Sequence, residues 1–490
     1  MALKSLPVPS LGQKTVRGVL VTLGGQWAKT LLQLGSTVVL ARMLVPDDFG
    51  MLAMVAAIIG LAELVRDFGL SGAIIQVKEI GDRLWSSLLW LSAALGTLLM
   101  LLVAASAPLI AALYGEPRLS LITLVLAPGL LINGICTPLQ TKLQRELRFS
   151  LLAKLEVSTM LLSVGAAIGG AALGWGVWSL VAMSAVGALY RLTILIARVK
   201  PHFGVPRISG EVFPFLSNGG SIFGSQLLNY AARNVDNVVV GSYLGPAVLG
   251  YYSRAYALLI TPLSQINGPL SRVALPVLSR LQDQPERFRR YISASLLVIA
   301  YVSLPVFAVL AGVAFPLVEL LLGPNWSASA AIFQLLAIAG LAQPLSSAVG
   351  WLFISLNRAH QQLLYSLAAQ PLLIGSYFAG IWLGGVQGLA LVYSLTSVVL
   401  LVPSFYFAIR GTFVNWRDVV VPIIKPLLLA PLVFLSSWTV TLTTELPAVA
   451  EVLLGGLAGL VPLLLAWLVL PPVRRDAAEI LAYVKQARRS

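Results

Sequence analysis

Lys29 is a charged residue whose position in the sequence calls for a chemical explanation. It lies near the middle of a long apolar segment, where a charge costs about 2.5–3.5 kcal/mol on insertion scales. Polar residues recur around it at three- and four-residue spacing and so share one helix face, namely Gln26, Lys29 or Thr30, Gln33 and Thr37. A lysine on such a stripe can bind an anion, because its ammonium group carries three hydrogen-bond donors.

A second polar stripe follows 200 residues later, in the same register. Its members are Ser225, Asn229, Arg233, Asp236 and Asn237, and Arg254 follows on the next apolar segment. Neither Lys29 nor Arg254 has an acidic neighbour on its own helix, so we predict a cationic cavity, lined from both stripes, that binds an anionic ligand. The predicted binding residues are Gln26, Lys29, Asn229, Arg233, Asp236 and Arg254. The alternative is that Arg233 pairs with Asp236 and only helps to hold the helices together.

Several other charges lie toward the inner ends of the predicted helices. The basic ones can extend to the lipid headgroups, and we expect them to do so: Arg66, Arg191, Arg272 and Lys425. Glu63 and Asp67 flank Arg66 and are, with Asp236, candidates for coupling to H⁺ or Na⁺. The alternative for Glu63 and Asp67 is a solvated helix end. Glu156 and Glu319 stand alone near membrane ends, and no role is predicted for them.

The composition indicates an integral membrane protein built from helices. Of the 490 residues, 58% are hydrophobic and 11% are charged, whereas a soluble domain carries about 25% charged residues. The single cysteine, Cys136, excludes a disulfide within the chain and a cysteine-based metal cluster, and the two histidines fall in predicted loops. We therefore predict no metal site and no cofactor. The net charge of +14 lies in short loops between apolar segments, so it does not indicate nucleic-acid binding.

The basic residues also predict how the chain crosses the membrane. Apolar segments of about 20 residues can cross a bilayer, and they predict about fourteen transmembrane helices between residues 17 and 470. With both termini in the cytoplasm, most of the 33 lysines and arginines fall in inner connections, whereas Arg42 and Arg118 alone fall in outer ones. Positive charge is retained on the cytoplasmic side during insertion, which supports this orientation and an even number of crossings.

The two polar stripes belong to an internal repeat. Residues 24–50 and 224–250 align without a gap, with identities at Gly24/Gly224, Gln26/Gln226, Val38/Val238, Val39/Val239, Leu44/Leu244, Pro46/Pro246 and Gly50/Gly250. The shared glycines and prolines predict the same helix, turn and helix start in both places. The first and seventh predicted crossings, at about 17–42 and 213–243, both run outward, so the halves are parallel repeats. Such repeats are found in transporters whose site lies between the halves.

The repeat divides the chain into five predicted parts. These are a cytoplasmic N-terminal segment (1–16), a first six-helix lobe (17–200), a second six-helix lobe (201–412), two further helices (413–471) and a basic cytoplasmic tail (472–490). We expect the tail to form a short amphipathic helix. The predicted fold class is an all-α integral membrane protein with two parallel six-helix repeats and two extra C-terminal helices.

Two stretches of the sequence resemble one family of membrane proteins. ARMLVPDDFGMLAMV (41–55), followed by RDFGLSGAIIQ (66–76), resembles the first-helix exit and the second-helix end of bacterial polysaccharide flippases. The stretch 236–291, which begins DNVVVGSYLGPAVLGYYSRAYALL, is similar to the colanic-acid-type branch, which exports exopolysaccharide repeat units. The family belongs to the multidrug/oligosaccharidyl-lipid/polysaccharide exporter superfamily.

The resemblance implies two six-helix lobes around a central cavity that opens alternately to the two sides of the bacterial cytoplasmic (inner) membrane. The implied substrate is an oligosaccharide linked to undecaprenyl diphosphate, moved for exopolysaccharide or lipopolysaccharide synthesis. Its diphosphate suits lysine and arginine donors. The implied partners are this lipid-linked oligosaccharide, membrane lipids and a polysaccharide polymerase or export machinery. The chain is then a transporter and not an enzyme.

Two other functions are alternatives. A drug or cation antiporter of the same superfamily would have an acidic cavity, which the excess of basic residues in the predicted cavity disfavours. A membrane polysaccharide polymerase or ligase would have a large outer loop bearing arginine or histidine. The predicted outer loops are short, and Arg118 is the arginine they offer.

Overall fold

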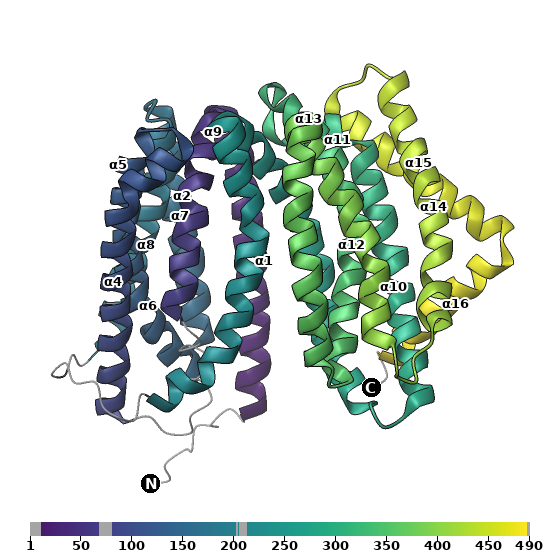
Figure 1. Ribbon diagram of the computed structural model, residues 1–490, viewed down its shortest axis with the longest axis horizontal. Helices are drawn as coiled ribbons and strands as arrows, with labels where there is room; N and C mark the ends of the chain where they lie inside the picture. Colours follow the sequence, from purple (N-terminus) through teal and green to yellow (C-terminus); the bar gives the residue numbers. More distant parts are fainter. Residues whose placement is uncertain (1–10, 68–80, 202–203, 205–212, 488–490) are drawn as a thin grey trace, which may run out of the picture. The chain divides into compact units, whose positions relative to one another are not determined.

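The computed structural model describes residues 11–67, 81–201, 204 and 213–487, and every regular element in these ranges is a helix (Figure 1). The first helices are α1 (Leu11–Met43), α2 (Pro46–Asp67), α4 (Asp82–Tyr114), α5 (Arg118–Leu126), α6 (Pro128–Arg145), α7 (Phe149–Ala172) and α8 (Val177–Val199). Those that follow are α9 (Phe213–Arg280), α10 (Pro285–Gly312), α11 (Ala314–Leu322), a 3-10 turn (Pro324–Trp326), α12 (Ser327–Ser355), α13 (Ala359–Ile409), α14 (Trp416–Thr443), α15 (Ala448–Val469) and α16 (Pro471–Ala487). The predicted all-α fold is confirmed.

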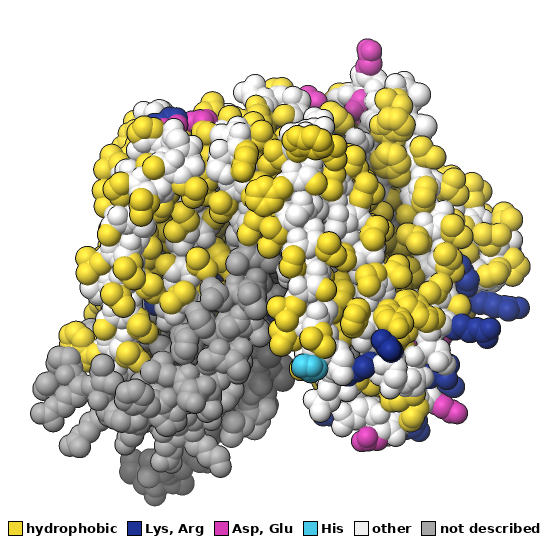
Figure 2. Space-filling view, in the orientation of Figure 1, with side chains coloured by type: hydrophobic (Ala, Val, Ile, Leu, Met, Phe, Trp, Pro, Cys, Tyr) yellow, Lys and Arg dark blue, Asp and Glu magenta, His cyan; other side chains and the backbone are white. Residues whose placement is uncertain are grey.

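Ten helical segments in the described ranges are long and apolar enough to cross a membrane. One of them is α13, whose backbone leaves the helical conformation at Gly384 and Gly385, so this element corresponds to two predicted crossings. Figure 2 shows hydrophobic side chains over the flanks of the helices. In the second half of the chain, Lys and Arg side chains gather toward the end where α16 lies. The chain is a multi-pass membrane protein.

The helices form two compact units, Met1–Gly250 and Tyr251–Ser490. The first unit extends past residue 200, where the sequence predicts the boundary between repeats, because the first part of α9 packs against α2. The Tyr230 hydroxyl donates a hydrogen bond of 2.9 Å to the carbonyl of Ala57. Gly60 leaves open the space that the Tyr230 hydroxyl occupies. Packing units and sequence repeats are thus different divisions of this chain, and the repeat boundaries stay a prediction.

The matched glycines and prolines of the repeat meet in the first unit. The backbone at Gly245 takes φ +83°, a left-handed value that favours glycine, and it breaks α9 at the place where the first repeat turns between α1 and α2. Beyond this break, a Cβ on Gly250 would overlap the carbonyl oxygen of Pro46, and a Cβ on Gly50 would overlap that of Pro246. The two helix starts therefore cross at backbone contact, and the predicted equivalence of the two turns is confirmed.

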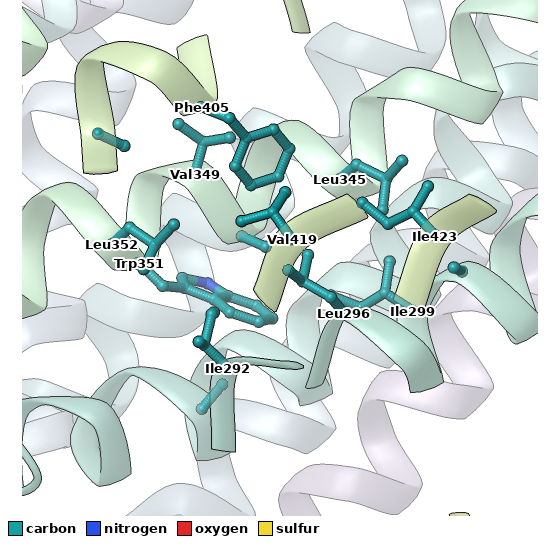
Figure 3. Packing of buried hydrophobic residues seen from close by; sticks show 14 of the residues in the cluster. Ile292, Leu296, Ile299, Leu345, Val349, Trp351, Leu352, Phe405, Val419 and Ile423 are labelled. Carbon is teal, nitrogen blue, oxygen red and sulfur yellow. The ribbon is translucent and has the colours of Figure 1, made fainter. Parts of the chain in front are cut away.

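The second unit has a large apolar core. Figure 3 shows Ile292, Leu296, Trp351 and Phe405 among the side chains that fill it, from α10, α12 and α13. Leu296 is completely buried, and the buried Trp351 indole donates a hydrogen bond of 3.0 Å to the Ser271 hydroxyl. Burial of side chains of this kind is the main favourable contribution to the stability of a helical unit.

Two ion pairs tie α14 to its neighbours in the second unit. Arg289 of α10 donates to the Asp418 carboxylate at 2.7 and 3.2 Å, and Lys425 Nζ lies 2.7 Å from the Asp476 carboxylate of α16. Tyr301 donates a further hydrogen bond of 2.8 Å to the buried Asp476. The basic C-terminal stretch thus forms a helix, as predicted. The amine of Lys425 binds Asp476, and its extension to the headgroups stays a prediction.

Candidate functional site

The first unit holds a polar cavity of about 260 Å³ between α1, α6, α7 and α8. The cavity exists because α7 packs against both α1 and α8, while α6 contacts α7 and α8. Its lining consists of Lys29, Asn133, Glu156, Thr159, Met160, Ser163, Met183, Ser184, Gly187, Ala188 and Arg191.

The sequence places polar and small residues on the cavity faces of two of these helices. On α7, Glu156, Thr159 and Ser163 recur at three- and four-residue spacing, which aligns them on one face. On α8, Gly187 and Arg191 share a face in the same way. Gly187 packs so closely that a Cβ would meet the Ser163 hydroxyl. Small residues thus bring α7 and α8 together, and the charged residues line the space that remains.

Three of the lining side chains are charged. Lys29 Nζ lies 3.5 Å from Glu156 Oε2, and the two side chains are 40% and 48% exposed. Arg191 lines the same cavity, and in the part of the chain that the structure describes it forms no ion pair. Two cations and one carboxylate leave one net positive charge in this cavity.

Asn133 connects the cavity to a second group of charges on α2. Its amide donates a hydrogen bond of 2.7 Å to Glu63, and Glu63 and Asp67 are the acidic groups that act on the Arg66 guanidinium. The Nε and Nη1 atoms of Arg66 are buried and lack a hydrogen-bond partner among the described residues. Within the same residues, no three His, Cys, Asp or Glu side chains gather closely enough to hold a metal ion. The α2 charges therefore form a group beside the cavity, joined to it by one amide.

Of the predicted stripe on α1, Lys29 is the residue that reaches the cavity. Gln26 is exposed and lies outside the lining. The hydroxyls of Thr30 and Thr37 donate to the carbonyls of Gln26 and Gln33 at 3.0 and 2.9 Å. Because these hydroxyls are satisfied by their own helix, the amine of Lys29 is the group of this stripe that is placed to meet a ligand.

The residues predicted on the second stripe are distributed over both units. Asp236 is 2% exposed, and its carboxylate accepts a hydrogen bond of 2.7 Å from the backbone N–H of Asn237. Arg254 belongs to the second unit. The side chains of Asn229 and Arg233 lie outside the described residues. A single cavity formed by all the predicted residues therefore stays a prediction.

Of the eleven residues that line the cavity, the sequence predicts Lys29, and two charged residues and one amide among the others bear on its chemistry. Arg191, expected at the headgroups, lines the cavity instead. Glu156, for which no role is predicted, forms the ion pair with Lys29, and Asn133 belongs to neither predicted stripe. The polar-stripe pattern that identifies Lys29 is also present on α7 and α8, so the same criterion could have found Glu156 and Arg191.

Comparison with known proteins gives consistent results. Residues 39–331 match the family model described as "Polysaccharide biosynthesis protein". The chain is 27% identical over 443 residues to the teichuronic acid biosynthesis protein TuaB of Bacillus subtilis. This alignment covers 89% of this chain and 91% of that protein. It is 25% identical over 417 residues to the lipopolysaccharide biosynthesis protein WzxC of Escherichia coli, covering 82% of each.

Among solved structures, the fold is similar to that of the lipid II flippase MurJ in an inward closed conformation. The TM-score is 0.70 at 14% sequence identity, and the match covers 92% of this chain and 99% of that one. At this level of identity the likeness concerns the fold.

Proposed function

This chain belongs to the family of polysaccharide biosynthesis proteins, and we propose that it is a flippase for lipid-linked oligosaccharides. Its substrate is an oligosaccharide on undecaprenyl diphosphate, moved from the inner to the outer leaflet of a bacterial cytoplasmic membrane for exopolysaccharide or lipopolysaccharide synthesis. Relatives named for teichuronic acid and lipopolysaccharide biosynthesis support this function, as does the fold shared with a lipid II flippase. The observation that carries the proposal is the pair of cations, Lys29 and Arg191, in a cavity between membrane helices.

The charge of this cavity suits a diphosphate. A diphosphate diester carries two negative charges, and Lys29 and Arg191 supply two positive ones. Charged side chains within a membrane are costly, so they indicate a ligand or a counter-ion. Both residue types form charge-assisted hydrogen bonds to phosphate oxygens.

The volume limits what the cavity can hold. Pockets for drug-sized ligands typically have about 300–1,000 Å³, whereas this cavity has about 260 Å³. It fits a diphosphate with part of the adjoining sugar, and the remaining sugars and the lipid chain lie outside it. The predicted residues Asn229, Arg233 and Arg254 are then assigned to the rest of the substrate.

Transport proceeds by alternating access, with 17–200 and 201–412 as the two moving lobes and with both termini in the cytoplasm. Glu63, Asp67 and Asp236 are the groups assigned to coupling with H⁺ or Na⁺. A polysaccharide polymerase or export machinery takes up the product on the outer side. These assignments are supported by the repeat and by the distribution of charge along the sequence.

The test is export of polysaccharide from a strain that lacks the native gene and carries single variants. Lys29→Ala, Arg191→Ala and Arg254→Ala should each lower export by about tenfold or more, because each removes a charge-assisted hydrogen bond. Lys154→Ala on α7 and Arg198→Ala on α8 are matched controls, since both side chains are exposed and neither lines the cavity. Undiminished export by the three variants at normal expression contradicts the site, and drug efflux without sugar export favours an antiporter.

A further inference from the structure

Glu156 is the acidic residue among the charged side chains that line the cavity of the first unit. Its carboxylate stands where the proposed diphosphate would meet Lys29, because Glu156 Oε2 already lies 3.5 Å from Lys29 Nζ. A substrate that binds Lys29 must therefore compete with a group of the protein itself. No role follows for Glu156 from its position in the sequence, so its presence in the site needs an explanation.

The geometry of this ion pair differs from that of a structural one. In the second unit, Lys425 and Asp476 lie 2.7 Å apart, with side chains 30% and 9% exposed, and Tyr301 completes the contact. The Lys29–Glu156 distance is 3.5 Å, and both side chains are more exposed, at 40% and 48%. An ion pair that is long and solvated contributes little to stability and can be exchanged for another partner.

We propose that Glu156 is a built-in counter-anion, which holds Lys29 in the empty site and gives it up when the diphosphate headgroup binds. The inference rests on the proposed function and names the residue that sets how tightly the headgroup is held. With Glu156 in place, the lining carries one net positive charge; once Glu156 has withdrawn from Lys29, two cations face the two charges of the diphosphate.

Arg191 explains why the competition favours a diphosphate over a singly charged anion. In the described part of the chain, Arg191 has no acidic partner and lines the same space as Lys29. A ligand with two charges can satisfy Arg191 and displace Glu156 from Lys29 together, whereas a ligand with one charge leaves one of the two cations to Glu156. Return of Glu156 to Lys29 then assists release on the far side, as a carrier requires.

Binding to the purified protein in lipid nanodiscs tests this inference. The probes are farnesyl diphosphate, which has a prenyl chain, and inorganic pyrophosphate, which has none. Glu156→Gln should bind both probes about three- to tenfold more tightly than the wild type, because the competing charge is removed. Within this range, a larger gain for farnesyl diphosphate identifies a lipid headgroup as the ligand, and an equal gain for both identifies the diphosphate alone; no gain for either contradicts the inference.

The matched control is Glu146→Gln. Glu146 forms an exposed ion pair with Arg148 at 3.6 Å, which resembles the Lys29–Glu156 pair in distance and exposure but lies outside the cavity. It should leave both affinities unchanged. In a Lys29→Gln background, most of the gain from Glu156→Gln should vanish, since Glu156 acts through Lys29. Glu156→Asp, which keeps the charge, should give a smaller gain and replaces the glutamine variant if that one does not fold.

The export assay separates this inference from the proposed function. Glu156→Gln should export more slowly than the wild type although it binds diphosphate more tightly, because release is retarded. If the wild type exports polysaccharide and binds diphosphate, while Glu156→Gln binds it no more tightly, the inference is wrong and the proposed function stands. If the wild type neither exports polysaccharide nor binds either probe, the proposed function is wrong and the inference is wrong with it.

Discussion

In the first unit, Lys29 and Glu156 stand 3.5 Å apart beside a cavity, whereas in the second Lys425 and Asp476 stand 2.7 Å apart between α14 and α16. Both pairs join a lysine of a long helix to an acid of another helix. The second pair is enclosed by Tyr301 and by the packing of α16. The first is solvated and shares its space with Arg191. A lysine–acid pair that is enclosed by other side chains thus holds two helices together. A pair that is solvated leaves its lysine available to a ligand.

The helices around the apolar core of the second unit are also more deeply buried than the two helices that line the cavity of the first. The membrane-spanning windows of α10 and α12 are each 61% buried, whereas those of α7 and α8 are each 22% buried. α10 and α12 thus contribute to the apolar core of the second unit, whereas α7 and α8 line the polar cavity of the first. Variants that remove groups from each unit should separate these two roles.

The largest effect is expected for Leu296→Ala in the core of the second unit. Leu296 is completely buried among the side chains of Figure 3, and such a truncation typically costs about 2–5 kcal/mol of unfolding free energy. Met160→Ala, at the cavity of the first unit, should cost clearly less because Met160 is half-buried. Equal losses of unfolding free energy in detergent would break the comparison.

A smaller loss is expected for Asp476→Asn. This change leaves the amine of Lys425 without its anion in a partly buried contact, at a cost of about 2 kcal/mol. Glu156→Gln should change the unfolding free energy by less than about 1 kcal/mol, because its pair is solvated. Asp476→Asn should therefore lower the unfolding free energy more than Glu156→Gln does, whereas Glu156→Gln should change diphosphate binding more.

Gly50→Ala should cost about 1–3 kcal/mol, because its new Cβ meets a backbone carbonyl, which cannot turn aside as a side chain can. Gly24→Ala is the matched control from the same repeat, since nothing lies within 4 Å of a Cβ there. It should be neutral or slightly stabilising, as alanine favours a helix. A Gly50→Ala protein with wild-type stability would show that the crossing with Pro246 is not a constraint.

The smallest effect is expected for the exposed ion pair of Glu116 with Arg118, which lie 2.7 Å apart. The hydrogen bond from Arg118 holds the pKa of Glu116 below its ordinary value. The contribution of this ion pair to the unfolding free energy is therefore fully present above the ordinary glutamate pKa, about 4.3. It is lost as the pH falls through the lowered pKa of Glu116 in the folded protein. The loss of unfolding free energy in Arg118→Gln should be below about 1 kcal/mol at pH 7 and smaller at pH 3.5; an equal loss at both would contradict this.

The repeat shows how much of the fold could be predicted. Gly50 and Gly250 mark helix starts in the sequence because glycine and proline act on the local backbone, and those turns are found where expected. That each glycine lies under the opposite proline carbonyl could not be predicted, since it depends on how α2 and α9 pack. Local patterns give local structure, and close approaches follow from packing.

The site was predictable to the same degree. Lys29 was identified from the polar stripe on its own helix, but its partner Glu156 lies 127 positions away. The position of Arg191 near a predicted helix end favours the headgroups, whereas the packing of α7 and α8 places its side chain at the cavity. The pattern of one helix can identify a charged residue that needs a partner, but the partner on another helix is known only once the packing of the helices is known.

The most direct test of the cavity is the rate at which purified protein in proteoliposomes moves a fluorescent oligosaccharide on undecaprenyl diphosphate between leaflets. Lys29→Met with Arg191→Met should reduce the rate by about a hundredfold, because two charge-assisted contacts to the diphosphate are lost. Lys154→Met with Arg198→Met, on α7 and α8 but outside the cavity, should leave the rate unchanged. Equal rates for the cavity variant and the wild type would contradict the account.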